Sequence, residues 1–95
     1  MPQVLNVNTA LRLFKIALGV NHDKRDEYFV PLLLSSAAEL RARGCALNLD
    51  EIEDSMLLAD YAEFHYRNRD GDKVIPRNLE LRIRNRQTQG RAGND

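Results

Sequence analysis

The chain has 95 residues, of which 43% are hydrophobic and 29% charged, and its formal net charge is zero. This length excludes more than one domain, and the composition excludes wholesale disorder. A single cysteine excludes an intramolecular disulfide and indicates a reducing compartment. No stretch approaches the roughly 20 apolar residues that span a bilayer, so we expect no membrane partner.

The zero net charge hides an asymmetry along the chain. Residues 23–63 carry ten acidic and four basic side chains, a net charge of −6. Residues 67–91 carry eight basic and three acidic side chains, a net charge of +5. An asymmetry of this kind generally reflects the partners of a protein.

The first expected helix covers residues 9–18, where apolar side chains recur with helical spacing. Asn8 or Thr9 can cap its start, because their side-chain oxygens accept hydrogen bonds from the free N–H groups of the first turn. Gly19 follows at the position where a left-handed residue ends a helix.

The second expected helix covers residues 23–43, with Asp23 as its N-cap and Gly44 at its end. Pro31 lies inside this segment, where it removes one backbone hydrogen bond and clashes with the preceding turn. Either the helix kinks at Pro31, or the first turn forms a separate short helix. The apolar face stays in phase across the proline, which favours a kink.

The third expected helix covers residues 49–69. Asn48 and Glu51 have the spacing of a capping box, in which the two residues bond each other's backbone N–H groups. Carboxylates near the start and arginines near the end match the helix dipole. These signals make it the best-defined helix of the sequence.

This third helix is apolar on two sides. A broad face of small and apolar residues runs along one side, and Leu57, Tyr61 and Phe64 form a second stripe. Two readings follow: the helix lies at the centre of the core, or it shares one stripe with another molecule. In the second case, Leu57 and Phe64 are the expected apolar anchors.

The fourth expected helix covers residues 76–87, with Pro76 at a favourable first position. Residues 88–95 have nothing to bury and are expected to form a flexible tail after a helical domain of residues 1–87. The sequence therefore predicts an all-α fold, a small bundle of about four helices with a flexible C-terminal tail.

The C-terminal helix and tail are rich in arginine. These side chains can dock on an acidic protein surface, contact nucleic-acid phosphate, or form a solvated face. Arginine outnumbers lysine, which favours specific bidentate contacts and hence protein docking. The basic side chains expected at such an interface are Arg77, Arg82, Arg84, Arg86 and Arg91.

Catalytic and metal-binding patterns are missing from the sequence. His22 and His65 are the only histidines, and Cys45 follows a helix-ending glycine, where a small apolar filler is the simplest interpretation. The acidic cluster at residues 50–54 lacks the alternating ligands and central glycine of a calcium-binding loop. We therefore expect a protein that is not an enzyme, with no catalytic residue, no metal ion and no cofactor.

Three stretches of the chain together resemble the head–tail connector, or neck adaptor, proteins of tailed bacteriophages. They are patterns of helix, turn and charge that cover most of residues 10–87. The first stretch is Leu18-Gly19-Val20-Asn21-His22-Asp23 with Asp26-Glu27-Tyr28-Phe29 and the helix up to Gly44. The second is Asp50-Glu51-Ile52-Glu53-Asp54 through Ala62 with Tyr66-Arg67-Asn68-Arg69. The third is Ile75-Pro76-Arg77-Asn78-Leu79 with Arg82-Ile83-Arg84-Asn85-Arg86.

This resemblance implies an all-helical subunit at the head–tail interface of a virion, made in the host cytoplasm. Such proteins form rings, commonly twelve-fold, which dock on the portal protein and extend the DNA channel. They offer a platform to neck and tail completion proteins, and DNA passes through them without sequence specificity. The isolated chain is expected to be a monomer that assembles on the portal. The alternative is a small nucleic-acid-binding or regulatory helical domain that uses the basic C-terminal helix.

Overall fold

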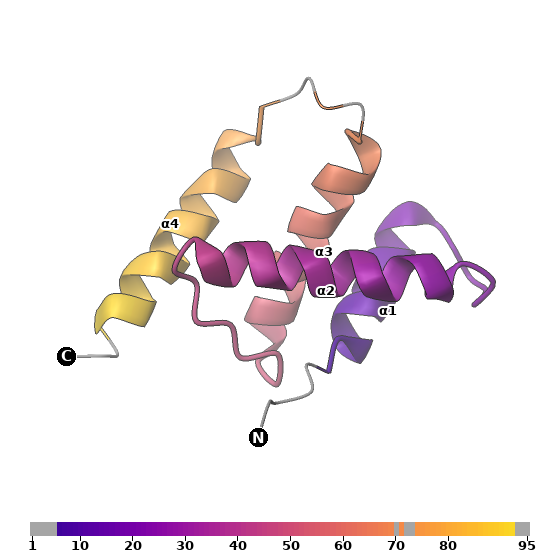
Figure 1. Ribbon diagram of the computed structural model, residues 1–95, viewed down its shortest axis with the longest axis horizontal. Helices are drawn as coiled ribbons and strands as arrows, with labels where there is room; N and C mark the ends of the chain where they lie inside the picture. The colour runs from indigo at the N-terminus through magenta and orange to yellow at the C-terminus, as the bar shows by residue number, and fades with distance from the viewer. Residues whose placement is uncertain (1–5, 70, 72–73, 93–95) are drawn as a thin grey trace.

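A computed structural model describes residues 6–69, 71 and 74–92, the last four of these by their backbone only. It confirms the predicted all-α class with four helices in the described part (Figure 1). The helices are α1 (Asn8–Leu18), α2 (Asp26–Ala42), α3 (Ile52–Arg67) and α4 (Arg77–Ala92). Among the described residues, none of the helices combines the length and the hydropathy that a transmembrane segment requires.

Helix α1 begins without a side-chain cap of its own. Val7 occupies the N-cap position, and the Asn6 side-chain oxygen accepts a hydrogen bond from the Asn8 N–H at 3.0 Å. The expected cap at Asn8 or Thr9 is therefore wrong. The N-cap position falls on Val7, and the side chain of Asn6 accepts the hydrogen bond from the first turn. The predicted stop is confirmed: Gly19 adopts a left-handed conformation with φ 76°.

Helix α2 begins three residues later than predicted. The Asp26 N–H donates to the Asp23 carbonyl at 3.2 Å, so residues 23–25 form a turn and Arg25 takes the N-cap position without a side-chain bond. The helix then continues through Pro31 to Ala42, which excludes the separate short helix before the proline. Figure 1 shows it as one helix that crosses in front of α1 and α3.

The start of α3 differs from the predicted capping box. Glu51 is the N-cap and makes no side-chain bond. Asn48 instead accepts a bond from the Asp50 N–H at 3.1 Å, and the Asn48 N–H donates to the Asp54 carboxylate at 2.7 Å. Because residues 48–51 form a turn, the helix begins only at Ile52. Asp54 therefore accepts the bond from the Asn48 N–H that was expected to go to Glu51.

Helix α4 continues beyond its predicted end at Gln87. The Gln87 side chain donates to the Arg43 carbonyl at 2.8 Å, and Thr88 Oγ1 donates to the Arg84 carbonyl at 3.1 Å. These bonds hold the helix at its predicted end, and the helix continues to Ala92. The first five residues of the predicted tail are thus helical, whereas residues 93–95 lie outside the described part.

Helix α3 is the centre of the core. It packs against each of the other three helices, and its buried residues face more than one direction around its axis. Leu58, Tyr61 and Ala62 are almost fully buried, together with Phe14 of α1 and Phe29 of α2. The two apolar sides of α3 therefore serve one core, as the first of the two readings predicts.

Candidate functional site

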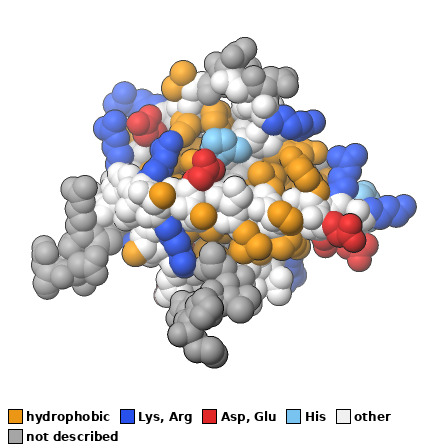
Figure 2. Space-filling model, in the orientation of Figure 1, with side chains coloured by type: hydrophobic (Ala, Val, Ile, Leu, Met, Phe, Trp, Pro, Cys, Tyr) orange, Lys and Arg blue, Asp and Glu red, His pale blue; other side chains and the backbone are white. Residues whose placement is uncertain are grey.

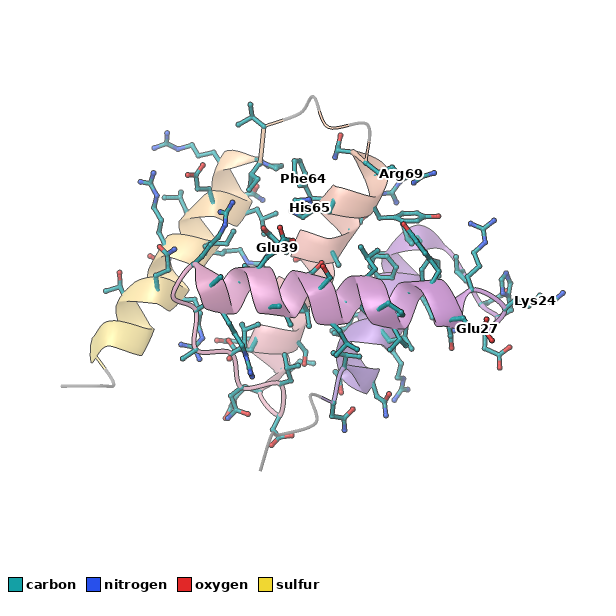
Figure 3. All side chains as sticks on the ribbon, in the orientation of Figure 1. Lys24, Glu27, Glu39, Phe64, His65 and Arg69 are labelled. Carbon is teal, nitrogen blue, oxygen red and sulfur yellow. The ribbon has the colours of Figure 1, made fainter. Side chains whose placement is uncertain are left out.

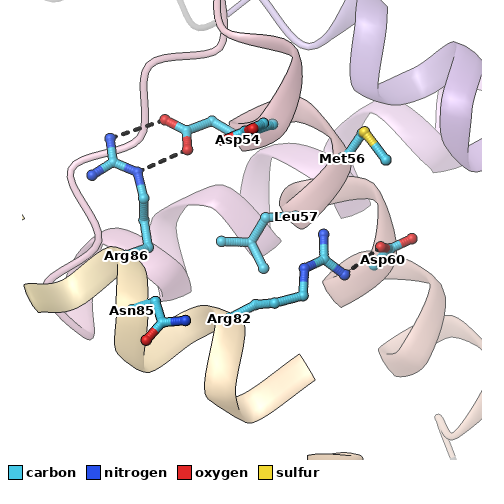
Figure 4. A pocket seen from close by; sticks show the side chains of 8 residues that line it. Asp54, Met56, Leu57, Asp60, Arg82, Asn85 and Arg86 are labelled. Atoms are coloured by element: carbon cyan, nitrogen blue, oxygen red, sulfur yellow. Dashed lines mark hydrogen bonds and ion pairs between the residues drawn. The ribbon is translucent and has the colours of Figure 1, made fainter. Parts of the chain in front are cut away.

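The seam between α3 and α4 brings the acidic and basic parts of the sequence together. Leu79 and Ile83 of α4 are buried in the same core as Leu57 of α3, which is 4% exposed. Burial of these three side chains holds α4 against α3. On either side of Leu57 an arginine of α4 meets an aspartate of α3 (Figure 4).

Arg86 and Asp54 form the more buried of the two ion pairs. Arg86 donates to the two carboxylate oxygens of Asp54 at 2.8 and 3.0 Å, and it also donates to the Ala46 carbonyl. The Asp54 side chain is 7% exposed and the Arg86 side chain 19% exposed. Arg86 thus ties α4 both to α3 and to the loop that precedes α3.

The hydrogen bonds of Asp54 outweigh its burial. Burial alone would raise the pKa of the Asp54 carboxyl, but the bonds from Arg86 and from the Asn48 N–H hold that pKa below its ordinary value. The hydrogen bond between Arg86 and Asp54 also raises the pKa of the Arg86 guanidinium. The pair is therefore ionised at neutral pH and acts as a fixed clamp.

Arg82 and Asp60 form the second, more open pair, with 2.6 Å between Arg82 Nη1 and an Asp60 carboxylate oxygen. Arg84 lies 69% exposed and makes a longer contact of 3.4 Å with Glu80 of its own helix. Arg77 is exposed in the first turn of α4. Two of the arginines predicted for docking, Arg82 and Arg86, are thus paired with α3, whereas Arg77 and Arg84 are exposed on α4.

The remaining predicted interface residues occupy different environments. Leu57 belongs to the core and is not presented to a partner in this conformation. Phe64 is half-buried and lies edge-on to the ring of His65, with 5.4 Å between ring centroids (Figure 3). Arg91 lies in the last turn of α4, and its side chain is outside the described part. The interface role of all these residues stays a prediction.

A groove of about 490 Å³ runs along the α3–α4 seam. Its floor includes Leu57, and Met56, which is 45% exposed, stands at its edge. The residues that line it are Glu53, Asp54, Met56, Leu57, Asp60, Arg82, Asn85 and Arg86 (Figure 4). Both ion pairs lie in its walls, so the groove offers apolar surface bordered by charge.

Cys45 and the histidines form no reactive group with one another. Cys45 is 1% exposed and its thiol lies 3.7 Å from the Ile83 carbonyl, and burial raises the pKa of that thiol, which disfavours the nucleophilic thiolate. His22 lies exposed in the loop before α2, and His65 packs edge-on against Tyr61. Within the described residues, no three His, Cys, Asp or Glu side chains gather as metal ligands would.

A second surface feature was not expected from the sequence. The outward face of α2 carries no charged side chain between Tyr28 and Ala38, and Tyr28 and Leu34 are 54% and 38% exposed. Figure 2 shows the hydrophobic side chains along this helix on the face toward the viewer. The sequence does contain this signal, since residues 28–38 include no charged side chain, and a helix segment without a charged side is normally buried.

Comparison of the chain with protein-family models, with curated proteins and with solved structures gives no significant match.

Proposed function

We propose that this chain is a structural subunit of the head–tail connector of a tailed bacteriophage. It docks on the portal protein as a ring of identical copies, extends the DNA channel and provides a platform for neck and tail completion proteins. The proposal starts from the resemblance of residues 10–87, and the all-α fold agrees with it. A twelve-fold ring at the head–tail interface of the virion is the expected form.

The observation that carries the proposal is that two arginines of α4 pair with α3 while two others are exposed on the opposite side of the helix. Arg82 and Arg86 fix the helix to α3, and Arg77 and Arg84 lie on its outer side. Leu81, 44% exposed, lies between these two in the sequence at helical spacing. The result is a stripe of two guanidinium groups and one apolar side chain on a helix that is already held in place.

A rigid stripe of this kind suits docking better than catalysis. Because α4 is ordered before binding, association avoids much of the entropy loss of immobilising a free segment. Arginine beside an exposed apolar side chain is also a common composition of binding surfaces.

The ion pairs weigh against the nucleic-acid alternative. A duplex-binding helix needs its basic side chains free to reach phosphates, and each phosphate contact steepens the salt dependence of binding. Arg82 and Arg86 are already paired with aspartates. The described part of α4 therefore leaves few cations for such contacts.

The test is to look for a portal-protein gene in the genome that encodes this chain and to mix the purified portal protein with the purified chain. Electron microscopy of the mixture should show rings of the chain seated on the portal. Arg77→Glu combined with Arg84→Glu should weaken co-purification about tenfold, because both charges of the stripe are reversed. Lys24→Glu, an exposed charge in the loop before α2, is the control and should have no effect. Absence of any complex with the wild-type chain refutes the proposal.

A further inference from the structure

Two grooves lie on opposite sides of α3. The first is the groove of the α3–α4 seam, and the second, of about 550 Å³, is formed by α1 and the start of α2. The residues that line the second groove are Asn8, Leu11, Arg12, Lys15, Ile16, Val20 and Asp26. Figure 1 shows α1 and α4 on opposite sides of α3, so the two grooves face different neighbours.

The exposed apolar side chains Ile16 and Met56 also lie at different heights along α3. Arg67 donates to the Ala17 carbonyl at 3.2 Å, so the end of α1 lies beside the end of α3. Met56 precedes Arg67 by eleven residues, which is a rise of about 16 Å along a helix. Ile16 and Met56 are therefore parts of two separate surfaces.

Each surface exposes a large apolar side chain in a helix, where a soluble protein normally places polar residues. Ile16 is 75% exposed beside the half-buried Leu11 and Val20 of the second groove. Ile52 and Met56 are 55% and 45% exposed and lie one helical turn apart on α3. Covering both surfaces at once would remove apolar area from water.

The charges around the two surfaces are opposite. The charged residues that line the α1 groove are Arg12, Lys15 and Asp26, a net charge of +1. Those that line the seam groove are Glu53 and the two paired sets Asp54–Arg86 and Asp60–Arg82, a net charge of −1. Lys15 is paired with Asp26 at 2.9 Å. Within the described residues Arg12 and Glu53 form no ion pair, and each lies within one turn of the exposed apolar side chain of its own surface.

We infer that these two surfaces are the two halves of one contact between copies of this chain. Ile52 and Met56 of one copy cover Ile16 and the second groove, formed by α1 and the start of α2, of the next copy. Glu53 pairs with Arg12 across the contact. The inference rests on the proposed function, since it names the contact between neighbouring subunits of the ring. Two different, complementary patches on each copy give head-to-tail association, which closes into a ring when the rotation between neighbours closes and otherwise forms an open filament.

The outer face of α2 is a weaker candidate for this contact. It is apolar but carries no charge along its middle, so nothing on it selects a partner or an orientation. A contact between identical α1 surfaces, or between identical α3 surfaces, would place like charges opposite each other. The pairing of α1 with α3 is the combination that satisfies both the apolar area and the charge.

Site-specific cross-linking tests the contact directly. A chain with Ile16→Cys and a chain with Met56→Cys are mixed at about millimolar concentration and treated with a short bismaleimide. We expect a covalent dimer from the mixture, and a ladder of longer products when both substitutions are in one chain. The wild-type chain is the blank, because Cys45 is 1% exposed. Ile16→Cys mixed with Leu34→Cys, a position 38% exposed on α2, is the matched control.

Two outcomes of this experiment overturn the inference. One is a yield from the Ile16 and Met56 mixture no higher than from the Leu34 control. The other is efficient dimer formation by Ile16→Cys alone, which would show that identical surfaces face each other.

Charge reversal provides an independent check. Arg12→Glu or Glu53→Arg alone should lower the cross-linking yield roughly three- to tenfold, as expected for the loss and reversal of one exposed ion pair. Arg12→Glu with Glu53→Arg in one chain should restore most of the yield, because the pair is rebuilt with its signs exchanged. A double variant as weak as the single variants contradicts the pairing.

The portal experiment keeps the two proposals apart. Rings on the portal without the predicted cross-links would leave the connector function standing and overturn this contact. Cross-links at the predicted positions without any binding to the portal would support the contact and overturn the connector function.

Discussion

Replacement of Arg86 by methionine tests the clamp between α3 and α4. Methionine keeps most of the aliphatic stem but removes the guanidinium, and with it the two bonds to Asp54 and the bond to the Ala46 carbonyl. The Asp54 carboxylate, 7% exposed, then keeps only the bond from the Asn48 N–H. The variant therefore leaves a buried charge without its counterion.

The expected loss in the free energy of unfolding is about 3 kcal/mol. Breaking a buried pair by removing one partner costs about 3–5 kcal/mol, and the partial exposure of Arg86, 19%, together with the remaining bond to Asn48, places this case at the lower end. For a domain of this size the melting temperature should fall by about 12–24 °C. A protein with a total stability of about 5–15 kcal/mol would lose a large part of it.

The assay is urea unfolding followed by circular dichroism at pH 7, arranged as a double-mutant cycle with Asp54→Asn. In the Arg86→Met background, Asp54→Asn should destabilise less than in the wild type, by about 1.5 kcal/mol or more, because the two residues are in contact. Arg84→Met is the control: that arginine is 69% exposed, and its loss should change stability by roughly 0.5 kcal/mol or less. Additive effects in the cycle, or an Arg86→Met loss no larger than that of the control, would refute the clamp.

Three further predictions concern single groups. Because the pKa of Asp54 lies below its ordinary value of 3.8, the advantage of the wild type over Asp54→Asn should be complete at neutral pH and shrink below about pH 4, as urea midpoints between pH 7 and pH 3 can check. Leu57→Ala should cost about 3 kcal/mol in urea unfolding, whereas Ile52→Ala, at a position 55% exposed, should cost well under 1 kcal/mol. Cys45 should react with Ellman's reagent slowly in the native chain and completely in urea, and immediate reaction of the native chain would contradict its burial.

The helices could be predicted from the sequence because their signals are local. Periodic apolar residues, the glycine after α1 and the proline before α4 identify the four segments without any knowledge of tertiary structure. The errors occur where a competing local bond was available. The turn of residues 48–51 and the reach of Asp54 back to Asn48 replace the expected capping box, and Asn6 replaces the expected cap of α1.

The partners of the charged side chains could not be predicted in the same way. Asp54 and Arg86 are 32 residues apart, and Asp60 and Arg82 are 22 residues apart. Their pairing depends on the antiparallel return of α4 along α3, and helical periodicity does not specify which faces meet. Sequence reasoning explained the carboxylates of α3 by the helix dipole alone, and this explanation omitted the clamp. The buried position of Leu57 was left open for the same reason.

The pairing across the seam changes the meaning of the charge asymmetry. The opposite charges on the middle and the end of the chain suggested contacts with partners, but Asp54 and Asp60 already meet their arginines within one copy. The exposed charges that the two proposed contacts use are Arg77 and Arg84 on the outer side of α4, Glu53 at the start of α3 and Arg12 on α1. Because these groups are exposed, each is worth little alone and is screened by salt. Specific association must therefore depend on the apolar side chains beside them, with the charges selecting which surfaces meet.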